Sequence, residues 1–222
     1  MQALEMFQNK KPVIAIDGTA GSGKGTLAKK IAKTLKFDHL DSGLLYRILA
    51  YEFLKFNKDY KILREIDIDL NIFLDKKKIK KLDLRSVSIT KTSSEIAKLK
   101  FVRQKLISLQ RKFANYPPNG IGSVIDGRDI TSVITPNAEI KLYIDANVKI
   151  RAERRLSQLG LPKSSYSMIL KELIDRDLQD KERKISPLVQ TADSYFIDTG
   201  RINEAEVLTI AVDHIKKKTD II

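Results

Sequence analysis

The sequence predicts an α/β fold with a parallel sheet, and three observations support this. Short apolar runs alternate with helical patterns along the chain, which is the order that parallel strands and their crossover helices produce. The three later runs end in aspartate, as strands do where such a sheet binds its ligand. The chain has 222 residues, enough for one medium domain or for one domain that carries a smaller insert.

The expected elements follow one another without a linker or a repeat. Residues 13–17 form an apolar run that ends in a polar residue before a glycine, which is typical of a buried parallel strand. A helix over 23–35 follows, because Leu27, Ile31 and Leu35 fall on one of its faces. Further strands are predicted at 123–126, 140–145 and 195–198, and further helices at 44–56, 95–113, 148–159, 166–182 and 204–218.

Residues 67–90 interrupt this order. Apolar residues alternate with polar ones on both sides of a lysine-rich stretch over 76–81, which predicts two short strands joined by a turn. The second of these strands would contain Leu82, Leu84, Val87 and Ile89. We therefore expect a small antiparallel insert here rather than another strand–helix–strand unit.

The composition excludes several kinds of site. Hydrophobic residues make up 42% and charged residues 31%, as in a soluble globular protein. Cysteine is absent, which excludes disulfides, a thiolate zinc site and a cysteine nucleophile, and two histidines far apart exclude a His-rich metal site. No apolar run approaches the roughly 18 residues of a membrane span, and residues 1–11 lack the apolar core of a signal peptide. A soluble cytoplasmic protein with no membrane partner is the expectation.

The net charge of +13 is compatible with several partners. Lysine supplies 29 of the 41 basic residues, and most of these lysines are expected to solvate the surface. A basic excess also suits a nucleic-acid surface or a small polyanion such as a nucleotide. Composition leaves these alternatives open.

The strongest local signal is a glycine-rich segment between the first strand and the first helix. Its glycines permit positive φ angles, so that backbone N–H groups can close around phosphate oxygens, and the helix N-terminus adds a favourable dipole. Lys24 can then reach the terminal phosphates. The alternative is a turn that only joins a strand to a helix, but such a turn does not require Gly, Lys and Thr at these offsets. The predicted phosphate-binding loop (P-loop) comprises Gly18, Thr19, Ala20, Gly21, Ser22, Gly23, Lys24, Gly25 and Thr26.

Arginine is scarcer than lysine in this chain, so its clusters are more informative. Its planar fork suits phosphate and stays charged at any working pH. Arg47 follows Ser42, a plausible N-cap, by about one helical turn, and Arg128 and Asp129 follow a strand that ends in Asp126 at the expected ligand crevice. The alternatives are a capped helix with a surface arginine, and a tight Asp-Gly turn.

Another arginine cluster lies on the predicted helix over 148–159. Arg151, Arg154 and Arg155 share one face, where three like charges repel one another unless an anion compensates them. The alternative is an ordinary solvated face.

Spacing also places Arg176, Asp180 and Arg183 on one helix face, where they can converge on one ligand. Taken alone, this cluster favours the alternative of an intrahelical ion ladder worth only about 0.3–0.5 kcal/mol per pair. Arg103 flanks an apolar helical stripe, so it either snorkels to solvent or points at a ligand between two layers.

Taken in order, these groups resemble the bacterial cytidylate kinases over nearly the whole chain. The most specific segments are the P-loop with its Gly-Lys-Gly-Thr ending, residues 40–47, residues 126–129 and residues 176–188. The resemblance implies an α/β parallel-sheet P-loop kinase core over 12–41, 115–150 and 190–222. It further implies a monophosphate-binding region with the insert over 42–114 and a short lid over 151–189.

The resemblance also implies the activity and the role of each site residue. ATP with Mg²⁺ phosphorylates CMP or dCMP, the P-loop binds the ATP phosphates, and Lys24, Arg128 and Arg183 are the catalytic residues. No protein metal ligand is implied, and Gly25 in the usual place of Ser or Thr leaves open whether a hydroxyl binds Mg²⁺ directly or through water. The implied substrate-binding residues are Ser42, Arg47, Ser94, Arg103, Arg128, Asp129, Arg176, Asp180 and Arg183, and the implied lid residues are Arg151, Arg154 and Arg155.

Within this assignment, Ser94, Arg103 and Asp129 read the base, while Arg176 and Asp180 hold the ribose. A slip of one residue would replace Ser94 by Ser93. A kinase for UMP, AMP or shikimate is the first alternative, and a P-loop nucleic-acid-binding protein is the second. The expected protein is a monomer that acts on small molecules and has no nucleic-acid partner.

Overall fold

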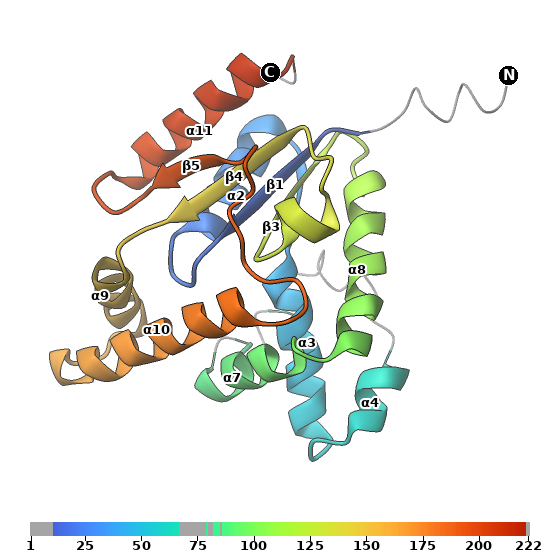
Figure 1. Cartoon of the computed structure of the whole chain (residues 1–222), viewed down its shortest axis with the longest axis vertical. Helices are drawn as coiled ribbons and strands as arrows, with labels where there is room; N and C mark the ends of the chain where they lie inside the picture. Colours follow the sequence, from blue (N-terminus) through green and yellow to red (C-terminus); the bar gives the residue numbers. More distant parts are fainter. Residues whose placement is uncertain (1–10, 67–78, 80–81, 85, 221–222) are drawn as a thin grey trace, which may run out of the picture.

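Five parallel strands form one sheet in the order β2-β3-β1-β4-β5, which confirms the predicted α/β class (Figure 1). The computed structural model describes residues 11–66, 79, 82–84 and 86–220. Pairing aligns the polar ends of the strands, with Asp41 opposite Asp126 and Asp145 opposite Asp198. The strands are β1 (Val13–Gly18), β2 (Asp38–Asp41), β3 (Ser123–Gly127), β4 (Ile140–Asp145) and β5 (Tyr195–Asp198).

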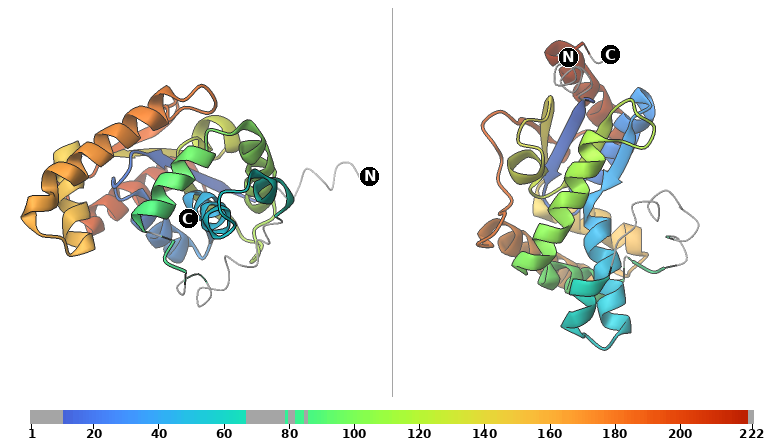
Figure 2. Two further views of the ribbon diagram at one scale, coloured as in Figure 1. Left: turned by 90° about the horizontal axis from the view of Figure 1, so that it is seen from below. Right: turned by 90° about the vertical axis from the view of Figure 1, so that its right-hand side faces the viewer.

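Helices cover both faces of the sheet. On one face lie α2 (Lys24–Leu35) and α11 (Glu204–Lys218), and on the other lie α3 (Ser42–Lys55) and α8 (Lys100–Asn115). The short helices α4 (Tyr60–Glu65) and α7 (Val87–Ile96) extend the second layer. Helices α9 (Val148–Leu159) and α10 (Tyr166–Glu182), joined by the 3-10 turn η2 (Lys163–Ser165), lie side by side at one edge (Figure 2).

Strand β1 shows how the two apolar cores arise. Ile14 and Ile16 pack with α2 and α11, whereas Val13 and Ala15 pack with α3 and α8. All four side chains are at least 98% buried, because a parallel sheet covered on both faces buries every residue of its central strand. The continuous apolar run at 13–17 therefore has a structural cause.

Most of the predicted elements have the predicted bounds to within two residues, but one predicted helix is in fact two. The helix expected over 95–113 breaks after α7 ends at Ile96, and α8 begins at Lys100. The break leaves the Ala97 carbonyl oxygen free to accept a hydrogen bond from Arg103 Nη1 at 3.2 Å. Helix α4 and a single π-helical turn, η1 (Ile130–Ile134), were not predicted.

The prediction of an antiparallel insert is wrong for the part of residues 67–90 that the structure describes. Val87 and Ile89, assigned to its second strand, lie in helix α7, and Leu84 lies in a turn. Leu84 and Ile89 are buried in the core beneath α3, so a helix satisfies the same apolar residues that suggested a strand. The first expected strand and the lysine-rich stretch lie outside the described residues, except Ile79.

Gly18 closes β1 in a conformation and a space that only glycine fits. Its φ is +154°, and a Cβ atom there would lie 1.9 Å from the Ile144 carbonyl oxygen of the neighbouring strand β4. The P-loop therefore leaves the sheet at a point where β1 lies too close to β4 for any side chain.

We expect Gly18→Ala to lower the free energy of unfolding by about 3 kcal/mol, because it combines an unfavourable φ with a backbone clash. Gly120→Ala is the matched control, since Gly120 also has a positive φ of 73° but no atom within 4 Å of the place its added methyl group would take. The control should lose about 1 kcal/mol. Urea titrations of both variants measure the difference, and equal losses would contradict the role given to the Ile144 contact.

Candidate active site

The predicted P-loop joins β1 to α2 and turns sharply at two glycines. Gly21 and Gly23 have φ angles of 75° and 88°, which the left-handed region permits for glycine. Ser22 is fully buried and its hydroxyl donates to the Thr19 carbonyl oxygen at 3.0 Å. The loop thus holds its own shape while the N-terminus of α2 opens onto the carboxyl edge of the sheet, where it favours an anion.

Lys24 lies at the first turn of α2 and folds back over this loop. Its Nζ donates to the Thr19 carbonyl oxygen at 3.1 Å. Burial, reinforced by the positive charge of Arg128, lowers the pKa of Lys24 to about 7. A phosphate in the loop would supply negative charge beside Lys24 and so favour its charged form.

Five of the predicted substrate-binding residues form one chain of alternating charges. Arg103 contacts Asp129, and Arg183 Nη2 lies 3.7 Å from the other Asp129 oxygen. Arg183 Nη1 lies 3.5 Å from Asp180 Oδ1, and Arg128 Nε donates to Asp180 Oδ2 at 2.7 Å. The chain joins β3, α8 and the end of α10, so residues up to 80 positions apart meet at one crevice.

Burial and charge in this crevice favour an anionic ligand. Burial raises the pKa of Asp180, but Arg128, Arg176 and Arg183 outweigh it and hold that pKa below its ordinary value. Burial, with Arg128 adding to it, lowers the pKa of Arg176 to about 10. Within the described structure, four buried polar atoms here have no hydrogen-bond partner: Tyr46 Oη, Arg103 Nε, Arg176 Nε and Arg183 Nη2. Unpaired buried donors of this kind are what a bound polar ligand satisfies.

Ser42 and Arg47 lie at the start of α3 beside this crevice. The N-cap of α3 is Asp41 rather than Ser42, since the Asp41 carboxylate accepts the Leu44 N–H at 3.1 Å. Ser42 is buried, and its Oγ lies so close to Gly127 that a Cβ atom there would be 2.4 Å away. Arg47 Nη2 lies 3.4 Å from Asp41 Oδ1, so the two polar residues of the turn are held together.

The serine of the predicted base site lies on α7. Both Ser93 and Ser94 donate to the Thr90 carbonyl oxygen, at 2.8 and 3.3 Å, with Ser93 buried and Ser94 half-buried. Among the described residues, no hydrogen bond joins Ser94 to the Arg103–Asp129 pair.

The predicted lid arginines do not share one anion site. Arg151 is buried and donates to the carbonyl oxygens of Ala20 and Ala146, at 2.9 and 2.7 Å. Arg154 donates to Thr199, and Arg155 donates to Gln158 Oε1 at 3.1 Å. The charge of Arg155 reaches the arginine cluster, where it adds to burial and to Arg128 in lowering the pKa of Arg176.

Two interactions behind the site were not predicted. Asp17, fully buried at the end of β1, accepts the N–H groups of Ile130 and Thr131 at 2.9 and 2.7 Å and so fixes the π-helical turn that follows Asp129. Burial raises the pKa of Asp17 to about 6, against these hydrogen bonds, which lower it. His39 Nε2 lies 2.7 Å from Asp126 Oδ1. The aspartates at the strand ends were the available signal, but a sequence does not show what each one contacts.

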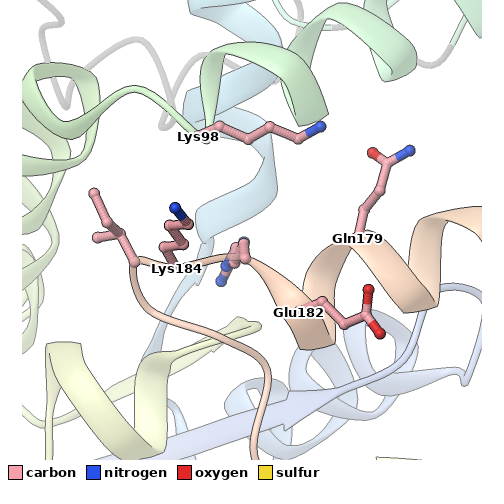
Figure 3. A pocket seen from close by; sticks show the side chains of 6 residues that line it. Lys98, Gln179, Glu182 and Lys184 are labelled. Carbon is pink, nitrogen blue, oxygen red and sulfur yellow. The ribbon is translucent and has the colours of Figure 1, made fainter.

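A cavity of about 430 Å³ opens beside Arg183 (Figure 3). Lys98, from the connection between α7 and α8, faces Gln179 of α10 across it. Its remaining lining residues are Glu182, Lys184 and Ile185. The cavity therefore lies between the α7–α8 connection and the end of α10, next to Arg183 of the charge chain.

A phosphate-binding loop and a buried arginine cluster that face one crevice on a parallel sheet define a P-loop phosphotransferase. Solved structures share this fold: an uncharacterized protein of Eubacterium ventriosum has a TM-score of 0.54 at 17% identity, covering 93% of this chain and 99% of that one. The protein TT1252 of Thermus thermophilus has a TM-score of 0.53 at 16% identity, covering 94% and 97%.

The family is shown by sequence comparison. The cytidylate kinase family model matches residues 14–217, so the chain belongs to the cytidylate kinase family. The cytidylate kinase of Paramagnetospirillum magneticum is 36% identical over 216 residues, covering 93% of this chain and 98% of that protein. The cytidylate kinase of Bartonella henselae is 40% identical over 205 residues, covering 90% and 92%.

Two features are absent from the part of the chain that the structure describes. None of the described helices is long and apolar enough to cross a membrane. The described residues also contain no group of three or more His, Cys, Asp or Glu side chains that could hold a metal ion.

We expect binding of an ATP analogue to take up a proton above pH 7. Lys24 has a pKa of about 7 without ligand, so it is largely neutral at pH 8 and largely charged at pH 6, and bound phosphates restore its charge. Calorimetry in buffers of different ionisation enthalpy should give an uptake of about one proton at pH 8 and almost none at pH 6. Lys24→Met should remove the uptake at pH 8, and its persistence in that variant would assign the proton to another group.

Proposed function

We propose that this protein transfers the γ-phosphoryl group of ATP to CMP or dCMP, giving CDP or dCDP. The observation that supports this most directly is the buried arginine chain with unpaired donors opposite the P-loop, in a chain of the cytidylate kinase family. Two anion sites on one crevice allow a donor and an acceptor phosphate to meet.

In the proposed mechanism, an oxygen of the CMP phosphate attacks the γ-phosphorus in line. The bond from that oxygen to the γ-phosphorus forms as the bond to the β–γ bridging oxygen breaks, and ADP leaves with the electron pair. No protein nucleophile is needed. Lys24, Arg128 and Arg183 stabilise charge on the transferring group, and their fixed positions avoid reorganisation during the reaction.

Mg²⁺ would travel with the donor phosphates and neutralise their charge. Asp126 lies beside the P-loop, since a Cβ atom at Gly25 would lie 3.4 Å from Asp126 Oδ2. Asp126 is the carboxylate that would hold the hydrated ion, since Mg²⁺ commonly keeps several waters and uses one or two carboxylates.

The roles of the acceptor residues are proposed from the family resemblance. We assign Ser42, Arg47, Arg128 and Arg183 to the CMP phosphate, and Arg176 and Asp180 to the ribose. The remaining residues, Ser94, Arg103 and Asp129, are assigned to the base. The pairing of Arg103 with Asp129 supports this last assignment, because it fixes which carboxylate oxygen stays available to a cytosine amino group.

Further expectations stay predictions. The proposed location is the cytoplasm, where ATP and nucleoside monophosphates occur together. A monomer without a nucleic-acid partner is also proposed, with the basic surface serving solubility.

The test of the proposed function is a coupled assay of ADP release with ATP and Mg²⁺, supplied separately with CMP, dCMP, UMP, AMP, GMP and shikimate. We expect CMP and dCMP to be turned over well above UMP and the others. Turnover of AMP or GMP instead would support the phosphotransferase activity but overturn the assignment of the base-binding residues. No acceptor-dependent turnover at all would overturn the proposed function.

Ser94 and Ser93 form a matched pair for the base site. We expect Ser94→Ala to raise KM for CMP by about ten-fold, as the loss of one hydrogen bond to the substrate can do. Ser93→Ala should leave KM within about two-fold, because the Ser93 hydroxyl is buried and donates to the Thr90 carbonyl oxygen at 2.8 Å, whereas Ser94 is half-buried and its bond to the same oxygen is longer, at 3.3 Å. Steady-state kinetics of both variants decide between the two serines, and the reverse result would move the assignment to Ser93.

A further inference from the structure

Asp177, next to Arg176 on α10, holds the P-loop rather than the acceptor crevice. Its Oδ1 accepts the backbone N–H of Ala20 at 3.2 Å, and its Oδ2 lies 2.7 Å from Arg151 Nη2. Only 8% of Asp177 is exposed, so this ion pair is shielded from solvent.

Arg151 completes the contact from α9. Its Nη1 donates to the Ala20 carbonyl oxygen at 2.9 Å, and its Nε donates to the Ala146 carbonyl oxygen at 2.7 Å. The N–H and the C=O of Ala20 belong to successive peptide groups, so Asp177 and Arg151 together fix both peptide planes that lead into the P-loop glycines.

Apolar packing joins the same elements. The Ala20 side chain is buried in a small cluster with Ala152 of α9 and with Ile169 and Leu173 of α10. The P-loop is therefore attached to α10 by both a polar and an apolar contact.

The same stretch of α10 carries the acceptor residues. Arg176 precedes Asp177, and Asp180 follows it by one helical turn and holds Arg128 at 2.7 Å. Any shift of α10 that adjusts these residues to a bound acceptor also moves the carboxylate that holds Ala20.

We propose that Asp177 is a positioning residue that, with Arg151, couples the donor and acceptor sites, so that each bound nucleotide strengthens binding of the other. This rests on the proposed function, since it takes the two ligands to be ATP and CMP. Such coupling is reciprocal. It is measured as the ratio of the Kd for one nucleotide in the absence of the other to its Kd in the presence of the other.

The test is calorimetric titration of the full chain with CMP, with and without a non-hydrolysable ATP analogue. In the wild-type protein the analogue should tighten CMP binding by about five-fold or more. In Asp177→Asn this ratio should fall below about two, while the Kd for CMP alone changes by less than about two-fold. A merely structural role for Asp177 would weaken both CMP titrations alike and leave the ratio unchanged.

Asp175→Asn is the matched control, because Asp175 lies on the same helix but is exposed, and it should keep the wild-type ratio. If Asp177→Asn fails to fold, Arg151→Lys replaces it: the lysine leaves Asp177 a charged partner but cannot also reach both carbonyl oxygens. The proposal is overturned if the analogue leaves the Kd for CMP unchanged in the wild-type protein. It is also overturned if the folded variant gives the same ratio of Kd values as the wild-type protein. Absence of CMP binding to the wild-type protein points instead to a wrong acceptor, and the ratio is then measured with the monophosphate that the assay identifies.

Discussion

Repulsion among closely spaced, mostly buried arginines is the constraint on which this site depends. Arg103, Arg128 and Arg183 approach one another only because Asp129 and Asp180 lie between them. The two carboxylates do not balance all the charge, and three guanidinium nitrogens in the described structure have no hydrogen-bond partner. A phosphate supplies both the missing charge and the missing acceptors, so the ligand completes an arrangement that the sheet and α10 hold in an incomplete form.

Local patterns were sufficient to predict most of the fold. Strands β1, β3 and β4 and helices α9, α10 and α11 follow from apolar runs and apolar periodicity, whereas β5 buries only Ile197. The prediction failed where distant contacts decide the backbone. Arg103 uses a carbonyl that the break after Ile96 exposes, and Asp17 fixes the π-helical turn from a strand more than a hundred residues away. The apolar residues Leu84 and Ile89 suit a strand or a helix equally well, and packing against α3 selects the latter.

The site was predictable where chemistry and spacing agree. The P-loop lies where its glycines and Lys24 predicted, and the spacing of Asp180 and Arg183 does bring them to one crevice. Helical spacing alone did not reveal the protein partners of Arg151 and Arg154, which are Ala20 and Asp177 for the first and Thr199 for the second. The role of Asp177 was not indicated by the sequence, for the same reason. Its neighbours Arg176 and Asp180 had the expected residue types for substrate binding, whereas Asp177 acts on the protein backbone.

The glycines of the P-loop are required for different structural reasons, and this affects which of them are retained when homologous sequences diverge. Gly18 is required by the Ile144 carbonyl oxygen against which it packs, so the need to fold preserves it even without a ligand. Gly23 has open space around it, and its positive φ is one that asparagine can also adopt. A descendant that no longer binds phosphate would therefore be expected to keep the first glycine and to lose Gly23 and Lys24. A single glycine retained at the end of such a strand would then indicate a requirement of sheet packing and would not indicate that the protein once was an enzyme.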